Sequence, residues 1–522
     1  MSVAQNSALV RFFAALWAVL SDGWAESVPG KILRRIEIAV RHGVEGSVLW
    51  QFVWRDGRIP GGWPGSLTCR VVTFIINIPC MIVQWLYKIW KNVWDGSIAF
   101  RIASALGGAT FVFLGLSMLL MLVVDHNNWN NAYTLLCMYG VMMLFLAGCM
   151  ARPKHRLDLD KLGPYYTLFM AFVCYGFLCS LGTDFSSGLV SGITGSLSWR
   201  FFVFHAIAFL ITLLTVSAVQ KVEQLQLMLV ISLFGLTVSA LYGCYQGYIG
   251  VEVVASQQDM TVNAGMPGRV YSVFDNPNNF AEQLVMLLPL ELALFLNSHW
   301  RGKILSLLAL CVGVVAIGLT YGRSCWIGLA LAVVVFLALI DWRWVPLFIV
   351  AGLVAIPFLP ETIYNRILTI TNTEDSSTQY RFEIYSTTSN LMRDHWVKGI
   401  GLGTDVMKEV FQTYPTNFDG TYPIHTHNNY LQMWAETGIW GVISFLALLL
   451  YQLKSGVKAF RAALDKRTKR LLAAALGAFC GILVVSVAEY TWFYPRNMFT
   501  YWFLFGIIAA CVKLVRQERK KA

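Results

Sequence analysis

Two histidines, His425 and His427, stand where a long polar segment gives way to an apolar one, in HTHNNYLQMWAETGIWG. An imidazole titrates near neutral pH, so a histidine at such a junction can act as a general base. The alternative is a structural histidine that caps a helix or completes a hydrogen bond. We predict that His427 is the base. His425, two residues earlier, competes for that role and is otherwise a substrate-binding candidate.

Three arginines lie upstream of this pair. Arg323 falls in GLTYGRSCWIGL, where a short turn joins two apolar segments and holds the charge near the membrane surface; the alternative role is that of a helix-end anchor. Arg381 begins QYRFEIYSTTSNLMRDHW, a predicted amphipathic helix that also contains Arg393. A charged residue on such a helix is often only solvated. We take all three as site candidates.

Most of these residues belong to one polar interval, residues 359–441, in an otherwise apolar part of the chain. A membrane protein that gathers its titratable groups in one loop is expected to place its chemistry there. Within the interval, GIGLGT resembles a dinucleotide-binding fingerprint. Because no strand pattern precedes it, we interpret Gly399, Gly401 and Gly403 as parts of a turn.

The composition indicates a membrane protein. The chain has 522 residues, of which 57% are hydrophobic and 13% charged, and its formal net charge is +11. Several apolar runs reach the roughly 18 residues that a spanning helix needs. A soluble domain of this composition would lack polar residues to cover its surface. We predict an all-α, polytopic helical membrane protein, and we interpret the positive charge as cytoplasmic loop charge, not as a nucleic-acid surface.

Neither a metal site nor a disulfide framework is expected. The 11 cysteines are scattered, mostly in apolar runs, and show no CxxC or Cys/His ligand spacing. The N-terminal sequence MSVAQNSALVRFF has no basic region followed by a small-residue cleavage site, so no cleavable signal peptide is predicted.

The chain divides into a membrane domain at 96–522 and an N-terminal part, 1–95, that mixes tryptophans with basic residues. We interpret the N-terminal part as an amphipathic extension on the cytoplasmic side. About twelve spans follow, with a large loop at 360–428 between the ninth and the tenth. The predicted spans are 101–124, 131–151, 164–182, 200–218, 225–249, 279–297, 303–320, 324–341, 343–359, 429–453, 471–490 and 497–514.

Lysine and arginine bias predicts the orientation. One set of alternating loops contains ARPKHRLDLDK, HWRGK and KSGVKAFRAALDKRTKR, whereas the other is poor in basic residues. The positive-inside rule therefore puts both termini in the cytoplasm and the large loop outside. The DxD of Asp158 and Asp160 could hold a metal and a nucleotide-sugar, but it is short, common and cytoplasmic. It carries little weight.

A few ionisable residues lie within or near the apolar spans and are functional candidates for that reason: His205, Glu291 and Glu489. Glu489 and Arg496 flank the outer turn YTWFYP. These two side chains could simply pair with each other.

Four segments in this order resemble the superfamily of O-antigen ligases and O-antigen polymerases, bacterial envelope glycosyltransferases. They are FDNPNNFAEQLVMLLPL, GLTYGRSCWIGLAL, YRFEIYSTTSNLMRDHWVKGIGLG and HNNYLQMWAETGIWG. In the last, His427, Asn428 and Gly438 have the spacing typical of the ligases. Val442 stands where a small or hydroxylated residue is more usual, which favours a polymerase slightly. The likeness covers roughly 225–515 and leaves 1–95 without a counterpart.

The resemblance implies a role for each matching residue. Arg323 and Arg381 would face the pyrophosphate of an undecaprenyl-pyrophosphate-linked glycan, and His427 would be the catalytic base. Arg269 resembles a further basic position upstream of the asparagine–proline motif. The remaining substrate-binding candidates are Asn278, His425, Arg393 and Glu489.

The implied reaction occurs at the outer face of the bacterial cytoplasmic (inner) membrane, among membrane lipids. An acceptor hydroxyl would attack the anomeric carbon in line and invert it, without metal or cofactor. In a ligase the acceptor is a lipid core, protein or wall polymer; in a polymerase it is another lipid-linked repeat. Other classes remain open: a small-anion transporter would bury its charges near the midplane, and a scaffold with a sensor loop would keep Arg323, Arg381 and His427 apart.

Overall fold

The computed structural model describes residues 57–181, 189–254, 265–371, 376–414 and 423–522, together with 26–47 and isolated positions before residue 57. The chain forms two compact units, Met1–Gly62 and Trp63–Ala522. In the described part of the first unit, α2 (Val28–Gly46) carries basic residues and exposed apolar ones such as Ile32 and Ile38. The short α4 (Arg58–Gly62) ends this unit.

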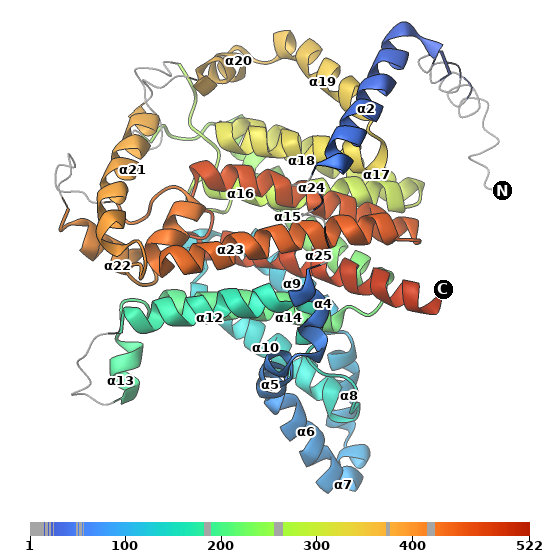
Figure 1. The fold of residues 1–522 in the computed structure, drawn as a ribbon, viewed down its shortest axis with the longest axis vertical. Helices are drawn as coiled ribbons and strands as arrows, with labels where there is room; N and C mark the ends of the chain where they lie inside the picture. The colour runs from blue at the N-terminus through green and yellow to red at the C-terminus, as the bar shows by residue number, and fades with distance from the viewer. Residues whose placement is uncertain are drawn as a thin grey trace. The chain divides into compact units, whose positions relative to one another are not determined.

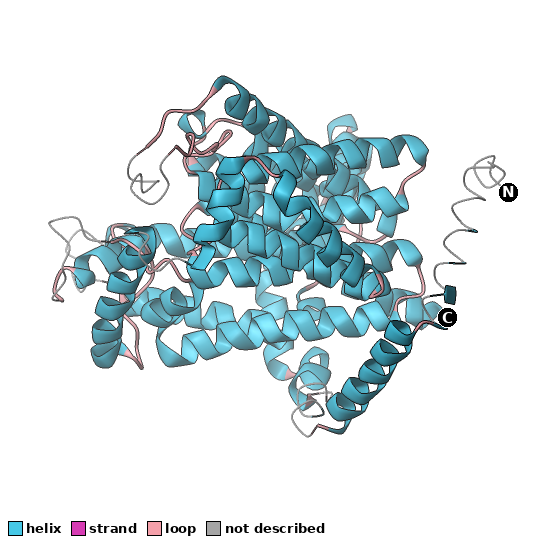
Figure 2. Cartoon of the chain, turned by 90° about the horizontal axis from the view of Figure 1, so that it is seen from above, coloured by secondary structure: helices cyan, strands magenta, loops and turns pink. Residues whose placement is uncertain are grey.

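The second unit is built from helices, and its described residues contain no strand (Figure 2). Those in its first half are α5 (Leu67–Ile76), α6 (Ile78–Ile89), α7 (Lys91–Gly96), α8 (Ile98–Gly108), α9 (Thr110–Val123), α10 (Asn131–Met150), α11 (Leu159–Leu162), α12 (Pro164–Cys179), α13 (Leu189–Thr194), α14 (Trp199–Ala218) and α15 (Val222–Ile249). Those in its second half are α16 (Pro277–Asn297), α17 (Trp300–Leu319), α18 (Arg323–Asp341), α19 (Trp344–Ala355), α20 (Glu361–Leu368), α21 (Ser376–His395), α22 (Thr404–Phe411), α23 (Asn429–Ala462), α24 (Lys466–Ala488) and α25 (Pro495–Lys521).

The predicted fold class is confirmed: the chain is an all-α polytopic membrane protein. Nine of the described helices are long and apolar enough to cross a membrane, or up to 12 if each of three bent pairs is one span. The first predicted span is such a pair, α8 and α9, bent by 70°. Helix α12 corresponds to the predicted span 164–182 and is a shorter apolar helix.

Residues 67–89 form a bent pair as well, α5 and α6, at an angle of 58°. Buried polar side chains tie this pair to the segment before α12. Asn77 donates to Leu157 O at 3.1 Å, and Gln84 donates to Arg152 O at 3.1 Å. The helices α5 and α6 therefore pack as part of the second unit.

The long helices lie side by side, and α25 is almost fully buried among them (Figure 1). Helices α24 and α18 approach closely because glycine faces the contact. A Cβ on Gly477 would lie 2.4 Å from the carbonyl oxygen of Ala332, so any larger residue would force the two helices apart.

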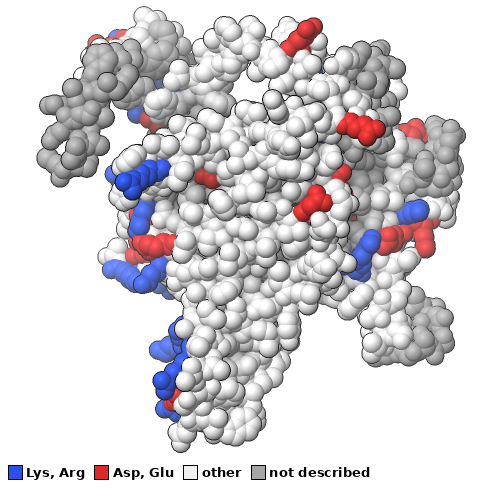
Figure 3. All heavy atoms as spheres, turned by 180° about the vertical axis from the view of Figure 1, so that it is seen from behind, with Lys and Arg blue, Asp and Glu red and all other residues white. Residues whose placement is uncertain are grey.

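Charged side chains avoid a broad band of the second unit's surface. On the face shown in Figure 3, most lysines and arginines lie along one edge, and an uncharged band separates them from the opposite edge. This is the surface expected of a protein whose flanks face apolar lipid. The DxD motif has a structural partner: Asp158 accepts a hydrogen bond from the buried Lys513 at 2.7 Å.

The predicted large loop contains helices of its own, α20, α21 and α22, and α21 and α22 lie at one end of the bundle (Figure 1). Helix α23 is broken near this end, at Gly438, with φ +70°. The break leaves some backbone groups of α23 without partners in the helix, and these groups hydrogen-bond to the loop instead. Ile400 N donates to Ala435 O at 2.7 Å, and Ile439 N donates to Trp396 O at 2.9 Å. The predicted turn at 399–403 is thus a docking segment, with positive φ at all three glycines.

Candidate active site

One carboxylate, Glu489, joins several of the predicted site residues. It follows the last residue of α24 and is almost buried. Its Oε1 accepts from Arg381 Nη2 at 2.6 Å and from Asn278 Nδ2 at 3.1 Å. Its Oε2 lies 3.4 Å from His427 Nδ1. The structure thus brings together a guanidinium group, an amide and an imidazole at one end of the bundle.

The helix ends explain why these side chains meet. Asn278 lies in the first turn of α16, which Asn276 caps by accepting from Asn278 N at 2.8 Å. His427 lies two residues before α23, which Asn428 caps by accepting from the backbone amides of Tyr430 and Leu431. Glu489, the residue after α24, therefore meets the N-terminal ends of two other helices. His427 and Asn278, which are 62 and 211 positions from Glu489 in the sequence, thereby come into contact with it.

His427 has an unusual backbone conformation that its neighbours hold in place. Its φ is +49°, in the left-handed region that non-glycine residues seldom occupy. The hydroxyl of Tyr385, on α21, donates to His427 O at 3.3 Å, and Asn428 Nδ2 donates to Val487 O at 2.9 Å. A strained backbone conformation persists where the surrounding contacts hold it in place, and such conformations are common at functional sites.

His425 supports the turn that carries His427. Its ring packs against Phe493 and His427, with centroid distances of 4.5 and 4.2 Å. His427 N donates to His425 Nδ1 at 3.3 Å, so this nitrogen must be unprotonated. Burial, and then the neighbouring His427, lower the pKa of His425 well below its usual value. His425 is therefore a neutral hydrogen-bond acceptor at neutral pH.

Glu489 is ionised at any physiological pH. Burial alone would raise its pKa, but the charge of Arg381 and the hydrogen bond to His427 outweigh burial and lower the pKa to about 2. The Nε atom of Arg381 is buried and has no hydrogen-bond partner among the residues described. This guanidinium group therefore keeps one N–H group, at Nε, that can donate a hydrogen bond to a further anionic oxygen.

Arg269 extends the cluster beyond Asn278. Its Nη2 donates to Asn278 Oδ1, and its Nε donates to Thr320 O at 2.7 Å. Burial, and then the nearby charge of Arg366, lower the pKa of Arg269 to about 10, so the group still carries its charge at neutral pH. The charges acting on Arg269 also include Glu489 and Arg381.

Arg366 is a candidate that the sequence analysis did not select. It lies on α20, is 7% exposed, and its Nε donates to Tyr321 O at 3.4 Å. The same signal that singled out Arg323, a positive charge on the side that usually avoids it, also applies to Arg366. The charges of Arg366 and Arg381 thus both act on Arg269, and Arg381 also pairs with Glu489.

Arg323 and Arg393 lie apart from Glu489. Arg323 begins α18, is half-buried, and its Nη1 donates to Thr369 O at 2.6 Å, which fastens the turn before α18 to the segment after α20. Arg393 is exposed in the last turn of α21. Of the three residues predicted to converge, Arg381 and His427 share a carboxylate, whereas Arg323 holds a neighbouring part of the loop.

The suggested pairing of Glu489 with Arg496 is wrong. Arg496 is buried, and its Nη1 donates to Val124 O at 2.8 Å and to Met121 O at 3.1 Å. Its guanidinium group lies over the rings of Trp129 and Phe274. The backbone carbonyls that end α9 hold Arg496, which leaves Glu489 to Arg381.

The other titratable candidates lie outside this cluster. His205, on α14, is buried, and its Nδ1 lies 2.9 Å from Phe201 O. Glu291 is buried on α16. Among the residues that the structure describes, no three His, Cys, Asp or Glu side chains are grouped so that they could hold a metal ion.

An apolar groove of about 440 Å³ begins beside His427. Tyr385 and Asn428 line its polar end, and both contact the backbone around His427 or the end of α24. Apolar side chains of α23 continue it past the break at Gly438, including Trp434, Ile439 and Leu446. A chain of hydrocarbon could lie in this groove with its polar head at the Glu489 cluster.

A comparison with known families gives one match. Residues 284–446, about a third of the chain, match the O-antigen ligase family, Wzy_C, so this part of the chain is similar to O-antigen ligases. The matched segment contains Arg366, Arg381 and His427 and ends before Glu489. No curated protein matches the chain.

Proposed function

We propose that this protein transfers a glycan from undecaprenyl pyrophosphate to an acceptor hydroxyl at the outer face of the cytoplasmic membrane. The observation that carries the proposal is the shared carboxylate: Glu489 contacts both His427 and Arg381. A base and an anion-binding group are thereby fixed next to each other, as a transfer from a pyrophosphate requires.

His427 would be the general base. With Nδ1 directed at the Glu489 carboxylate, this nitrogen carries the proton, and Nε2 is left as the basic atom. Nε2 would take the proton of the acceptor hydroxyl while its oxygen forms a bond to the anomeric carbon. The bond from that carbon to the pyrophosphate oxygen breaks, its electron pair leaves with the pyrophosphate, and the anomeric configuration inverts.

The arginines would stabilise the leaving pyrophosphate. Arg366 and Arg381 both act on Arg269, and of these three it is Arg381 that pairs with Glu489, so the cluster would attract an anion with more than one charge. Guanidinium groups pair with phosphate oxygens in two-point contacts and stay protonated. Arg323, which fastens the loop through Thr369, is proposed to meet the phosphates from the neighbouring turn, with Arg393 and His425 as outer and supporting groups of the binding region.

The groove beside His427 supports a lipid-linked donor. It opens on the flank of α23 and is mostly apolar, which suits a polyprenyl chain lying between the helix surface and the membrane lipids. The acceptor would be a glycan, a lipid or a wall polymer. No metal or organic cofactor is needed in this scheme, because cleavage of the pyrophosphate link supplies the driving force.

The proposed orientation puts both termini in the cytoplasm. Basic side chains lie along one edge in Figure 3, and the positive-inside rule assigns such an edge to the cytoplasm. The loop at 360–428, with α21 at the other end of the bundle, is then outside. We place the transferase in residues 96–522 and the cytoplasmic-side extension in the part of residues 1–95 that precedes α5, because α5 and α6 pack with the second unit.

The position of the cluster favours an enzyme over a small-anion transporter. Transporter sites lie near the bilayer midplane between broken helices. Here Asn278 lies in the first turn of α16, His427 lies two residues before α23, and Glu489 follows the last residue of α24. A scaffold with a sensor loop would not need a histidine and an arginine on one buried carboxylate.

Deletion of the gene for this protein, followed by measurement of lipid-linked glycan, tests the proposal. Cells without it are expected to accumulate lipid-linked glycan, and the purified protein in nanodiscs should move that glycan to the acceptor with inversion of the anomeric centre. A product that stays lipid-linked and grows by one repeat would identify a polymerase-like reaction. Unchanged lipid-linked pools in the deletion strain, together with no transfer by the purified protein, would refute both versions.

A further inference from the structure

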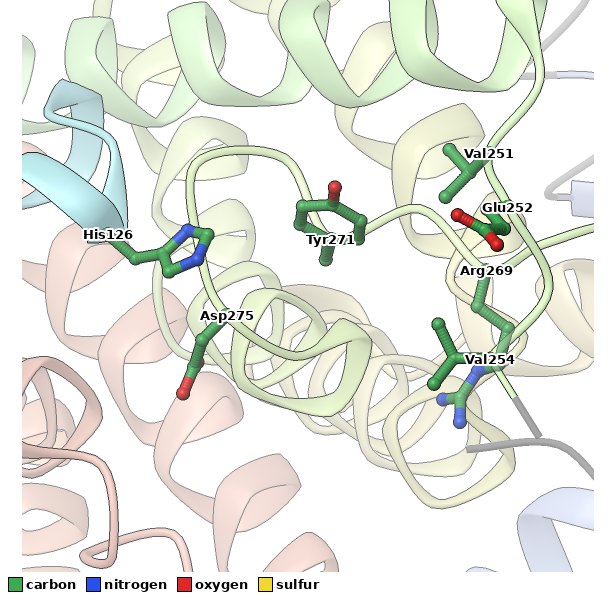
Figure 4. A pocket seen from close by; sticks show the side chains of 7 residues that line it. All are labelled: His126, Val251, Glu252, Val254, Arg269, Tyr271 and Asp275. Carbon is green, nitrogen blue, oxygen red and sulfur yellow. The ribbon is translucent and has the colours of Figure 1, made fainter. Parts of the chain in front are cut away.

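A second cavity, of about 220 Å³, is lined in part by Arg269 (Figure 4). One wall comes from the turn after α9, through His126, and the rest from the segment between α15 and α16. Figure 4 shows Tyr271 between His126 and Arg269, with Asp275 below His126 and Glu252 beside Arg269. A cavity of this volume has room for one sugar ring.

The cavity has a rigid frame. Gln246, at the end of α15, accepts through Oε1 from Ser272 N at 2.7 Å and donates through Nε2 to Ser272 O at 3.1 Å. Ser272 has a φ of +56°, so this clamp holds a strained turn that presents Tyr271. On the other wall, His126 N donates to Val273 O at 2.9 Å. The lining residues are therefore positioned by backbone contacts that exist without a ligand.

The polar lining is rich in hydrogen-bond acceptors. Glu252 and Asp275 are exposed carboxylates, and Asp275 uses Oδ1 to accept from Asn279 at 2.7 Å. His126 Nδ1 makes no hydrogen bond within the described structure. Two carboxylates repel a phosphate or an anionic polymer. Vicinal hydroxyl groups, by contrast, donate in pairs to a carboxylate, and an aromatic ring such as Tyr271 packs against the C–H face of a sugar.

Arg269 connects this cavity to the Glu489 cluster. Its side chain lines the cavity, and its Nη2 donates to Asn278, whose amide donates to Glu489. A ring held beside Tyr271 would therefore lie one guanidinium group and one amide away from the carboxylate that orients His427. That spacing suits the sugar next to the reacting centre, not the reacting centre itself.

We propose that this cavity is a subsite for one uncharged sugar ring of a substrate glycan, held by Glu252, Asp275 and Tyr271. The inference rests on the proposed glycan transfer. The ring could belong to the donor glycan or to the acceptor, since both offer the same hydroxyl chemistry. Since two carboxylates, Glu252 and Asp275, outnumber the one guanidinium group of Arg269 in the lining, the cavity favours an uncharged ring over the pyrophosphate.

The test measures sugar binding by saturation-transfer NMR on the full chain in nanodiscs. One probe is the glycan released by mild acid from the lipid-linked pool, and the other is the unmodified acceptor glycan from cells lacking the protein. Glu252→Gln and Asp275→Asn should each weaken binding of the same probe about tenfold, as for loss of one charge-assisted hydrogen bond. Glu409→Gln, at an exposed carboxylate of α22, is the matched control.

The outcome also separates this subsite from the transfer reaction. Weaker binding of the first probe alone assigns the cavity to the donor, and of the second alone to the acceptor. If both variants bind both probes as the control does, the subsite is refuted even though transfer continues. If the wild type binds a probe through Glu252 and Asp275 but moves no glycan from the lipid, the proposed function fails and the subsite stands.

Discussion

The Nδ1 atom of His427 lies 3.4 Å from Oε2 of Glu489, although the two residues belong to opposite ends of different helices. The other oxygen of this carboxylate is 2.6 Å from Arg381. A single buried charge therefore orients the proposed base and holds the nearest guanidinium group.

Replacing Glu489 with Gln keeps the size of the side chain and removes its charge. His427 would lose the group that fixes its tautomer, and Arg381 its ionic partner, so we expect kcat to fall by about 10²- to 10⁴-fold, the range for acid–base groups and their orienting carboxylates. Glycan transfer by the purified variant is the measurement. Glu409→Gln should transfer at the wild-type rate, and equal rates for both variants would contradict the role of Glu489.

Arg366 is expected to contribute to binding of the pyrophosphate. Arg366→Ala removes one of the positive charges around Arg269, and we predict a loss of about 10²-fold in transfer. Arg393→Ala, at an exposed position of the same loop, should change the rate less than threefold. The comparison uses initial rates at matched protein amounts in nanodiscs. The small effect at Arg393 is expected because this residue is only an outer group of the binding region, and a larger effect at Arg393 than at Arg366 would reverse the assignment.

Gly438 is predicted to be essential for docking of the loop on α23. A Cβ at this residue would lie 1.9 Å from the carbonyl oxygen of Val397, and its φ of +70° disfavours any L side chain. Gly438→Ala should destabilise the protein by about 1–3 kcal/mol and lower its thermal midpoint. Gly140→Ala, in a helix where the added methyl meets no atom within 4 Å, should leave the midpoint unchanged or raise it. Similar midpoints for both variants would argue against the docking contact.

Stability should fall as the pH drops below the ordinary pKa of histidine, partly because of His425. Its folded pKa lies well below the usual 6.5, so the unfolded chain binds the proton more readily than the native one. The neutral ring is fully compatible with the fold above pH 6.5, and protonation favours unfolding below it. His425→Gln should flatten the loss of thermal stability between pH 7 and 5. An unchanged slope would show that other groups cause it.

The helices were predictable from the sequence because each apolar run is long and bounded by charge or by turn residues. Helix α16 begins at Pro277 and α23 at Asn429, each within two residues of the predicted start. The candidate loop and His427 were also identifiable, since an ionisable group in a membrane protein is costly unless it has a function.

The partners of these residues were not predictable. Glu489 meets Arg381 across 108 residues and Asn278 across 211, and no local pattern encodes such distances. Arg496 was the nearer basic residue in sequence, yet the carbonyls at the end of α9 bind it. The break of α23 at Gly438 could not be anticipated either, because its freed backbone groups are satisfied by a distant turn.

The most direct test of the account is a single-turnover measurement of glycan transfer by His427→Ala in nanodiscs, with donor binding measured in parallel. We predict that transfer falls at least 100-fold, the usual cost of losing a general base, while the donor still binds, since Arg269, Arg366 and Arg381 remain. Transfer at the wild-type rate by a folded His427→Ala protein would contradict the assignment of His427 as the base held by Glu489.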